Sequence, residues 1–227
     1  MNEFSRSQPI PLHYTCYVLR LSPILAFSLC ICCLSAQENI RRVDFENFSY
    51  PLSGNLLGHD RLQWIDSPSH AAREKTLVHL VDGSDLTKTS SFVMEGKEYS
   101  QFAGFTLDSV KYADLMGDGK EEAIVVLTYQ TGGTQTTNYL YIYRINQNQP
   151  KLLAFCHTGD RSDFGLNDVY GKDGMLVFEL LDPEKAIGDC CSSGAIISFY
   201  KWQDGAFKPA GPQKRRALPP PEVHPDK

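Results

Sequence analysis

Short apolar runs separated by tight-turn sequences fill the chain from Val110 onward. Two runs, residues 123–129 and residues 138–145, are apolar or aromatic at most positions. Successive side chains of a strand point to opposite faces. The second run therefore has two apolar rows, one on each face: Tyr139, Tyr141, Tyr143 and Ile145, and opposite them Leu140 and Ile142. Such strands lie in the middle of a sheet that is covered on both sides.

Glycine-containing turn sequences lie between the runs. They are Gly117-Asp118-Gly119, Thr131-Gly132-Gly133-Thr134, Lys172-Asp173-Gly174 and Asp204-Gly205. Strands joined by hairpin-length connections pair antiparallel, whereas parallel strands need crossovers of a dozen residues or more. The predicted strands are residues 110–115, 122–129, 138–145, 151–157, 167–170, 175–181, 195–202 and 206–208. We predict a mainly β, single-domain antiparallel meander with little helix, built as a curved sheet, a sandwich or a partly closed barrel.

The parts on either side of this meander are less regular. Strands are expected at residues 43–50 and 76–81, with one or two helical turns at 68–74, and we place the domain at residues 37–208. Residues 209–227 are rich in proline and contain Lys214-Arg215-Arg216. This composition predicts a disordered basic tail with no packed element.

The N-terminal segment has the pattern of an export signal. Arg20 precedes an apolar run from Ile24 to Leu34, and Ser35-Ala36-Gln37 follows it. A basic flank, an apolar run of about ten residues and small residues at its end are typical of a secretory signal peptide. We predict a signal peptide at residues 1–36, cleavage after Ala36, and a secreted or periplasmic protein with no membrane-spanning segment left after cleavage.

Lipid anchoring is the less favoured alternative. A lipoprotein signal has a small residue before the modified cysteine, but Leu29 precedes Cys30, and Ile31 precedes Cys32. The charge balance bears on the class of partner that the chain could bind. Lys and Arg number 22 against 27 Asp and Glu, a formal net charge of -5, which argues against a nucleic-acid partner.

One acidic loop resembles a calcium-binding sequence. In Asp114-Leu115-Met116-Gly117-Asp118-Gly119-Lys120-Glu121-Glu122, the carboxylates of Asp114, Asp118 and Glu122 stand at the first, fifth and ninth positions. Met116 at the third position offers no hard oxygen. The favoured interpretation is a hairpin loop in which Gly117 and Gly119 have positive φ. The alternative is a weak calcium site formed by the three carboxylates, and no other cofactor is expected.

Cysteine positions leave two disulfide pairings open. Four of the seven cysteines lie in the predicted signal peptide, so Cys156, Cys190 and Cys191 remain. A bridge from Cys156 to Cys190 or Cys191 closes a loop of about 35 residues and stabilises the fold by roughly 3–4 kcal/mol in the chain-entropy model. A Cys190–Cys191 bridge joins residues with Cα atoms about 3.8 Å apart, so it is strained.

No catalytic residues are assigned. Cys156 and His157 are neighbours in a predicted strand, so their side chains point to opposite faces and do not meet. The tyrosine row of residues 139–143 is interpreted as cross-strand packing, with a ligand-stacking surface as the alternative.

Several stretches together resemble a known group of proteins. They are Asp44-Phe45-Glu46-Asn47-Phe48-Ser49-Tyr50-Pro51, Gly117 to Val125, Thr131-Gly132-Gly133, Gly188-Asp189-Cys190-Cys191 and Tyr200-Lys201-Trp202. The chain is similar to uncharacterised exported bacterial proteins, and its C-terminal part resembles the LppP/LprE-type mycobacterial lipoprotein domain. Ser192 stands where that domain usually has proline after the paired cysteines. The resemblance implies an envelope location, a β-rich domain and a Cys190–Cys191 bridge, with Cys156 a buried thiol on the face of Leu152 and Ala154.

These observations lead to two hypotheses. The first is a non-enzymatic envelope or secreted module that binds a partner, a glycan or a small ligand through its sheet. The alternative is a hydrolase or thiol-redox protein whose site is assembled from separated residues. A pocket that gathers His79 or His157 with carboxylates would favour the enzyme, and a flat aromatic face would favour the binding module.

Overall fold

The computed structural model describes residues 39–52, 77–133, 135–159, 164–187 and 191–219. All of them belong to one compact unit, Glu38–Lys227. The predicted signal peptide and the helical turns predicted at 68–74 lie outside the described residues.

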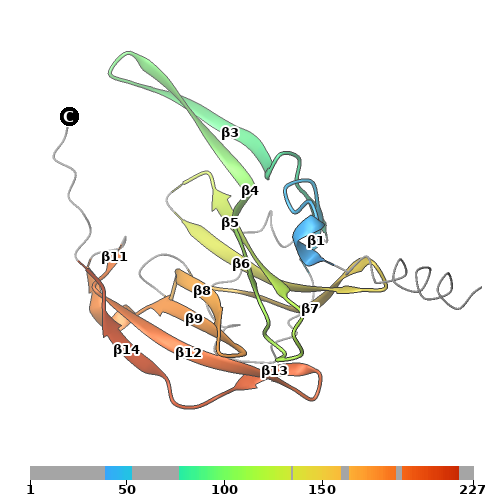
Figure 1. The fold of residues 1–227 in the computed structure, drawn as a ribbon. Coiled ribbons are helices and arrows are strands. Elements are labelled where there is room, and N and C mark those ends of the chain that lie inside the picture. Colours follow the sequence, from blue (N-terminus) through green and yellow to red (C-terminus); the bar gives the residue numbers. More distant parts are fainter. Residues whose placement is uncertain (1–38, 53–76, 134, 160–163, 188–190, 220–227) are drawn as a thin grey trace, which may run out of the picture. The chain divides into compact units, whose positions relative to one another are not determined.

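A five-stranded antiparallel meander forms the first sheet (Figure 1). Its strands follow one another in the order of the sequence: β3 (Ser84–Met94), β4 (Lys97–Ala113), β5 (Glu122–Thr131), β6 (Thr136–Asn146) and β7 (Gln149–His157). This confirms the predicted antiparallel meander. β4 is much longer than the strand predicted at 110–115, and β3 was not predicted.

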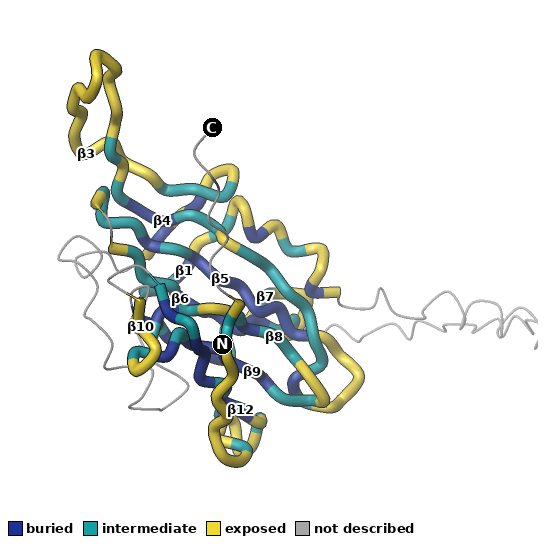
Figure 2. Tube along the Cα trace, turned by 90° about the vertical axis from the view of Figure 1, so that its left-hand side faces the viewer, coloured by how far each residue is buried: buried dark blue, intermediate teal, exposed yellow. Residues whose placement is uncertain are grey.

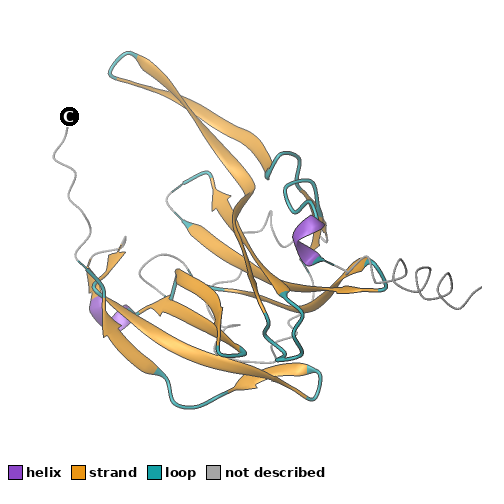
Figure 3. Ribbon diagram, in the orientation of Figure 1, coloured by secondary structure: helices purple, strands orange, loops and turns teal. Residues whose placement is uncertain are grey.

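A second antiparallel sheet follows in the sequence. It has the order β13-β12-β9-β8, and β14 also pairs with β12. The bounds are β8 (Leu166–Lys172), β9 (Met175–Leu181), β12 (Gly194–Gln203), β13 (Ala206–Pro209) and β14 (Lys214–Ala217). Shorter elements are β1 (Ser49–Pro51) paired with β2 (Leu77–His79), β10 (Ala186–Ile187) paired with β11 (Cys191–Ser192), and the 3-10 helices η1 (Ile40–Arg42) and η2 (Pro183–Lys185). Strands dominate the described residues (Figure 3).

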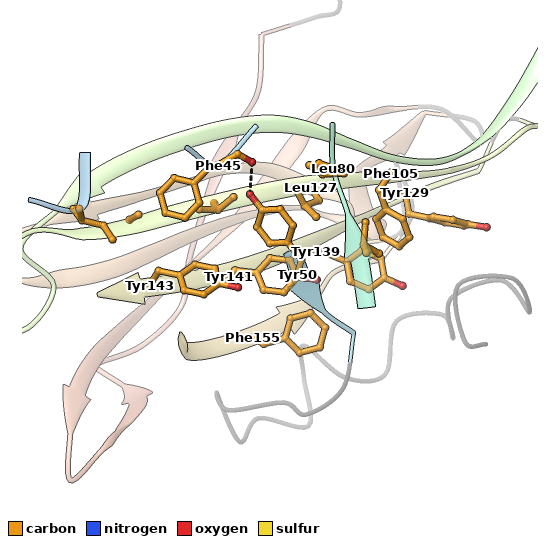
Figure 4. Close-up of a cluster of buried hydrophobic side chains, with 14 residues drawn as sticks. Phe45, Tyr50, Leu80, Phe105, Leu127, Tyr129, Tyr139, Tyr141, Tyr143 and Phe155 are labelled. Carbon is orange, nitrogen blue, oxygen red and sulfur yellow. Dashed lines mark hydrogen bonds between the residues drawn. The ribbon is translucent and has the colours of Figure 1, made fainter. Parts of the chain in front are cut away.

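The central strands β5 and β6 of the first sheet are buried on both faces, as predicted (Figure 2). On one face, Tyr139, Tyr141 and Tyr143 pack with Phe45, which precedes β1, and with Tyr50, the middle residue of β1 (Figure 4). On the other face the core contains residues of both sheets: Ile124, Val126, Leu140 and Ile142 from the first, and Leu176, Phe178 and Tyr200 from the second. The two sheets therefore pack as a sandwich, one of the three arrangements that the sequence left open.

A β-bulge in β7 corrects one predicted face. Ile142 of β6 pairs with Ala154, but the next residue, Tyr143, pairs with Leu152, so Leu153 is the extra residue. An extra residue in one strand reverses the alternation of its side chains. Leu152 consequently packs on the tyrosine side, while Ala154 and Cys156 pack between the sheets. The prediction that Cys156 is buried is confirmed, and its assignment to the face of Leu152 is wrong.

The tail also differs from its prediction. Residues 214–217 form β14 and pair with Gly194–Ile197 of β12. Arg215 forms an ion pair with Glu184, and Arg216 forms one with the buried Glu179 of β9. The sequence predicted a disordered tail here because the acidic partners of these basic residues lie more than 30 residues away in the sequence. All four β14 side chains are nevertheless exposed.

Candidate functional site

The β3–β4 hairpin extends past the rest of its sheet. β5 pairs with β4 only from Ala103 onward, so in the described residues the part of β4 from Lys97 to Phe102 pairs with β3 alone. We call residues 86–102 the arm. It projects beyond β5 in Figure 1 and is exposed over most of its length in Figure 2. At the base of the arm, Gly104 has φ +141, and a Cβ atom there would lie 1.9 Å from the carbonyl oxygen of Asp85. The close approach of β4 to β3 at this point therefore requires glycine.

Large apolar side chains are exposed on both faces of the arm. The cross-strand register places Phe92 opposite Tyr99, and their rings stack with centroids 5.5 Å apart. Side chains alternate between faces, so Val93 lies on the other face. The exposed large hydrophobic residues of the arm are Leu86, Phe92, Val93, Met94, Tyr99 and Phe102, which are 39–72% exposed. A concentration of apolar surface on one element marks an interaction site more often than scattered exposed residues do.

No described strand pairs with the outer edge of the arm. β3 is the edge strand of its sheet, and its eleven residues contain no proline and a single lysine, Lys88. Long edge strands are normally protected by charges, prolines or bulges, because their free N–H and C=O groups pair with other strands. Here one irregularity, between Lys88 and Ser90, interrupts the register. The arm therefore offers both apolar side chains and main-chain hydrogen-bonding groups.

Sequence reasoning missed the arm because its strands lack the signals on which the prediction relied. Neither face of this hairpin is buried, so no apolar alternation separates an inner from an outer face. One signal was available in the sequence, the glycine at position 96, a residue type favoured in tight turns. Glu95 and Gly96 both have positive φ, 51° and 77°, which is the conformation of a two-residue hairpin turn between antiparallel strands.

The acidic loop between β4 and β5 is organised by its own backbone. Asp114 accepts hydrogen bonds from the backbone N–H groups of Gly117, Asp118 and Gly119. Gly117 and Gly119 have φ of +74° and +81°, as predicted for a hairpin loop.

Arg144 of β6 supplies the positive charge next to this loop. Its guanidinium forms an ion pair with Asp118 and hydrogen-bonds the sulfur of Met116 at 2.7 Å. Its Nε lies 3.8 Å from Oε1 of Glu122, which is fully buried, while Oε2 of Glu122 accepts a 2.8 Å bond from the Leu115 N–H. Two of the three carboxylates nominated for calcium thus face a guanidinium, and the third binds backbone N–H groups.

The pKa values of the two carboxylates near Arg144 are shifted in opposite directions. The hydrogen bond from Arg144 lowers the pKa of Asp118. Burial raises the pKa of Glu122 to about 7, despite the Leu115 N–H and the charge of Arg144, which both lower it. Within the described residues, no three His, Cys, Asp or Glu side chains gather closely enough to hold a metal ion. Weak calcium binding by Asp114, Asp118 and Glu122 therefore stays a prediction.

The remaining nominated residues do not form one site. Cys156 is a buried thiol between the sheets, and burial raises its pKa above the ordinary value. Cys191 is partly buried in β11, and Cys190 lies outside the described residues, so their predicted bridge stays a prediction. His157 is on the opposite face from Cys156, with its ring 5.8 Å from that of Tyr139, and burial lowers its pKa. The exposed His79 contacts Ser49 through Nδ1 at 2.9 Å.

The tyrosine row is buried and therefore belongs to the core. Tyr139, Tyr141 and Tyr143 are at most 3% exposed and contact Phe155, Phe45 and each other through their rings. This supports cross-strand packing over an exposed ligand-stacking surface. In the part of the chain that the structure describes, the exposed aromatic side chains are instead those of the arm.

In comparisons with known proteins, no family model, curated protein or solved structure matches this chain.

Proposed function

We propose that this chain is an exported, non-enzymatic binding module, and that the arm binds an extended segment of a partner polypeptide. The observation that carries this proposal is the exposure of six large apolar side chains on one two-stranded projection. An isolated hairpin is marginally stable in water, and cover over its apolar side chains stabilises it. A partner on the arm supplies that cover.

The open edge of β3 favours a polypeptide over a glycan or a lipid surface. A partner strand added to this edge pairs with main-chain groups that no described strand uses, and its alternate side chains contact Phe92 and Val93 on the two faces. The charges on the arm agree with this choice. Lys88 lies 3.8 Å from Glu98, Glu95 lies in the turn and Lys97 follows it, so neither sign dominates. A surface for anionic lipid would instead carry an excess of positive charge.

The test is site-specific photo-cross-linking in cells that produce the full chain. A photoreactive residue at position 93 reports on the arm, and the same residue at the exposed position 172, at the end of β8, is the matched control. We expect a polypeptide adduct from position 93 only, and its loss when Phe92→Ser and Tyr99→Ser are added. The adduct's mass separates a second copy of the chain from a different protein. Equal labelling from both positions, or an adduct unaffected by the two serines, would contradict the proposal.

The thiol-redox alternative is less well supported. Reactive cysteines are exposed and have a lowered pKa, whereas Cys156 is buried between two sheets with a raised pKa. A hydrolase built on Ser49 and His79 lacks support of the same kind. In the described part of the chain, no carboxylate hydrogen-bonds His79 to orient its ring, and Nδ1, which usually takes that partner, faces Ser49.

Export and envelope location enter this proposal from the sequence. They rest on the signal-like residues 1–36 and on the resemblance to the LppP/LprE-type lipoprotein domain. In the described residues, no helix has the length and apolar character needed to span a bilayer.

A further inference from the structure

Three phenol groups lie buried in the core of the first sheet. The hydroxyl oxygens of Tyr139, Tyr141 and Tyr143 are buried, and none has a partner among the described residues. His157, directly opposite Tyr139 on β7, has a buried Nδ1 in the same situation. The three tyrosine rings lie in a row along β6 (Figure 4).

Nearby, the fold satisfies a fourth phenol fully. The hydroxyl of Tyr50 donates a 2.6 Å hydrogen bond to the carbonyl oxygen of Phe45, and the Tyr50 ring lies 5.1 Å from that of Tyr141. A buried hydroxyl left without a partner costs more free energy than an ordinary hydrogen bond contributes. Buried polar groups in native proteins are accordingly paired with protein atoms or with ordered water. Four such groups on one face, without hydrogen-bond partners in the described part of the chain, therefore call for bound water.

The spacing of the row matches a water molecule between neighbouring hydroxyls. The rings of Tyr141 and Tyr143 are nearly parallel, at 15°, with centroids 6.2 Å apart. Two O–H···O bonds in series span about 5.5 Å, whereas one spans about 2.8 Å. Hydroxyls that repeat at this ring spacing would be too far apart to bond directly and close enough to share one water. The same two-residue spacing, about 6.6 Å along a strand, separates Tyr139 from Tyr141.

The charge state of the row also favours water over an ion. Burial raises the pKa of all three phenols and lowers the pKa of His157, so all four groups are uncharged near neutral pH. Each phenol both donates and accepts, as does a water molecule, so a file of alternating phenol and water satisfies both partners. An ion in the same place would have no opposite charge among these four groups.

We infer that Tyr139, Tyr141, Tyr143 and His157 bind a file of ordered water molecules in the core of the first sheet. Each water bridges two neighbouring groups of the row. This site lies in the core and is independent of the arm, so its test and the cross-linking test fail separately.

Oxygen-17 magnetic relaxation dispersion counts long-lived buried waters in solution and tests this inference. We expect the double variant Tyr141→Phe/Tyr143→Phe to contain at least one such water fewer than the unaltered chain. Tyr50→Phe is the matched control, since its hydroxyl is already bonded to Phe45, and it should leave the count unchanged. An unchanged count in the double variant would overturn the inference.

Thermal unfolding of the single variants gives a second readout with a different sign for each case. If water bonds the hydroxyl, Tyr141→Phe removes hydrogen bonds and lowers Tm. If the hydroxyl is dry and unpaired, Tyr141→Phe removes a buried unsatisfied group and raises Tm. A rise in Tm for Tyr141→Phe and Tyr143→Phe would overturn the inference.

Discussion

The backbone N–H of Leu115 donates a 2.8 Å hydrogen bond to the buried Oε2 of Glu122. This bond ties the start of the acidic loop to the first residue of β5, seven positions later in the sequence. The bond holds a carboxyl group in the protein interior, with the Arg144 guanidinium beside its other oxygen. Glu122 therefore holds the start of the loop through the Leu115 N–H, and Asp114 holds its turn through the N–H groups of Gly117 and Gly119.

Glu122 should make stability depend on pH. Its pKa is about 7 in the folded chain and near 4.5 when unfolded, so between these values the folded state binds a proton that the unfolded state lacks. The free energy of unfolding contributed by this group therefore falls as pH rises from 5 to 8, by an amount on the order of 2 kcal/mol. Glu122→Gln should remove this fall, as measured by urea unfolding at pH 5, 6.5 and 8.

The neighbouring acid is the control for that experiment. Glu121 is exposed, pairs with Arg41 on the surface and has a lowered pKa, so Glu121→Gln should keep the pH dependence between 5 and 8. If Glu122→Gln and the unaltered chain lose stability equally over this range, the buried carboxyl is not the group responsible.

Asp114 and Asp118 should differ in their contributions to the loop. Asp114→Ala leaves three backbone N–H groups without their acceptor and should cost about 1–2 kcal/mol. Asp118→Ala removes a partly exposed ion pair and should cost less than about 1 kcal/mol. Chemical denaturation with and without calcium measures both, and we expect the two costs to be independent of calcium.

Calorimetric titration tests the metal directly. We expect no calcium binding tighter than the roughly millimolar range of weak extracellular sites. Micromolar binding that Asp118→Ala abolishes would show that calcium displaces Arg144 from Asp118.

A single glycine should control the contact between β8 and β4. A Cβ atom on Gly171 would lie 2.1 Å from Cβ of Ala113 and 2.9 Å from Cδ2 of Leu115. Gly171→Ala should therefore destabilise the fold by about 1–3 kcal/mol through overpacking. Adding Ala113→Gly should recover part of the loss, whereas Gly133→Ala, whose nearest contact would be 3.6 Å away, should cost little. An equal effect of the two alanine substitutions would contradict this account.

Cys156 should react with alkylating reagents only when the protein opens. Its thiol is 1% exposed and its pKa is raised by burial, so little thiolate forms. Iodoacetamide labelling followed by peptide mapping without reduction should find Cys156 unlabelled before unfolding and alkylated after it, and Cys190 linked to Cys191. A Cys156 peptide joined to either of the other two would reject the Cys190–Cys191 pairing.

The sequence by itself determined the central strands and the loops between them. Runs such as residues 138–145 carry apolar side chains on both faces of the strand. A strand of this kind is stable only inside a sheet that is covered on both sides. Turns with glycine at positive φ, such as those at Gly117 and Gly119, depend on local sterics and can therefore also be predicted from the local sequence. These features follow from neighbouring residues alone.

Only the tertiary structure decided which faces meet and which stay exposed. The bulge at Leu153 reversed the side-chain alternation of β7, and partners distant in the sequence, Arg216 with Glu179, placed β14 in the second sheet. Tyr139 and Phe92 are both aromatic residues in strands, yet one is buried and the other is 44% exposed. The difference arises because β1 and its flanking residues cover the first sheet and the arm extends beyond it, a matter of long-range packing that no local pattern encodes.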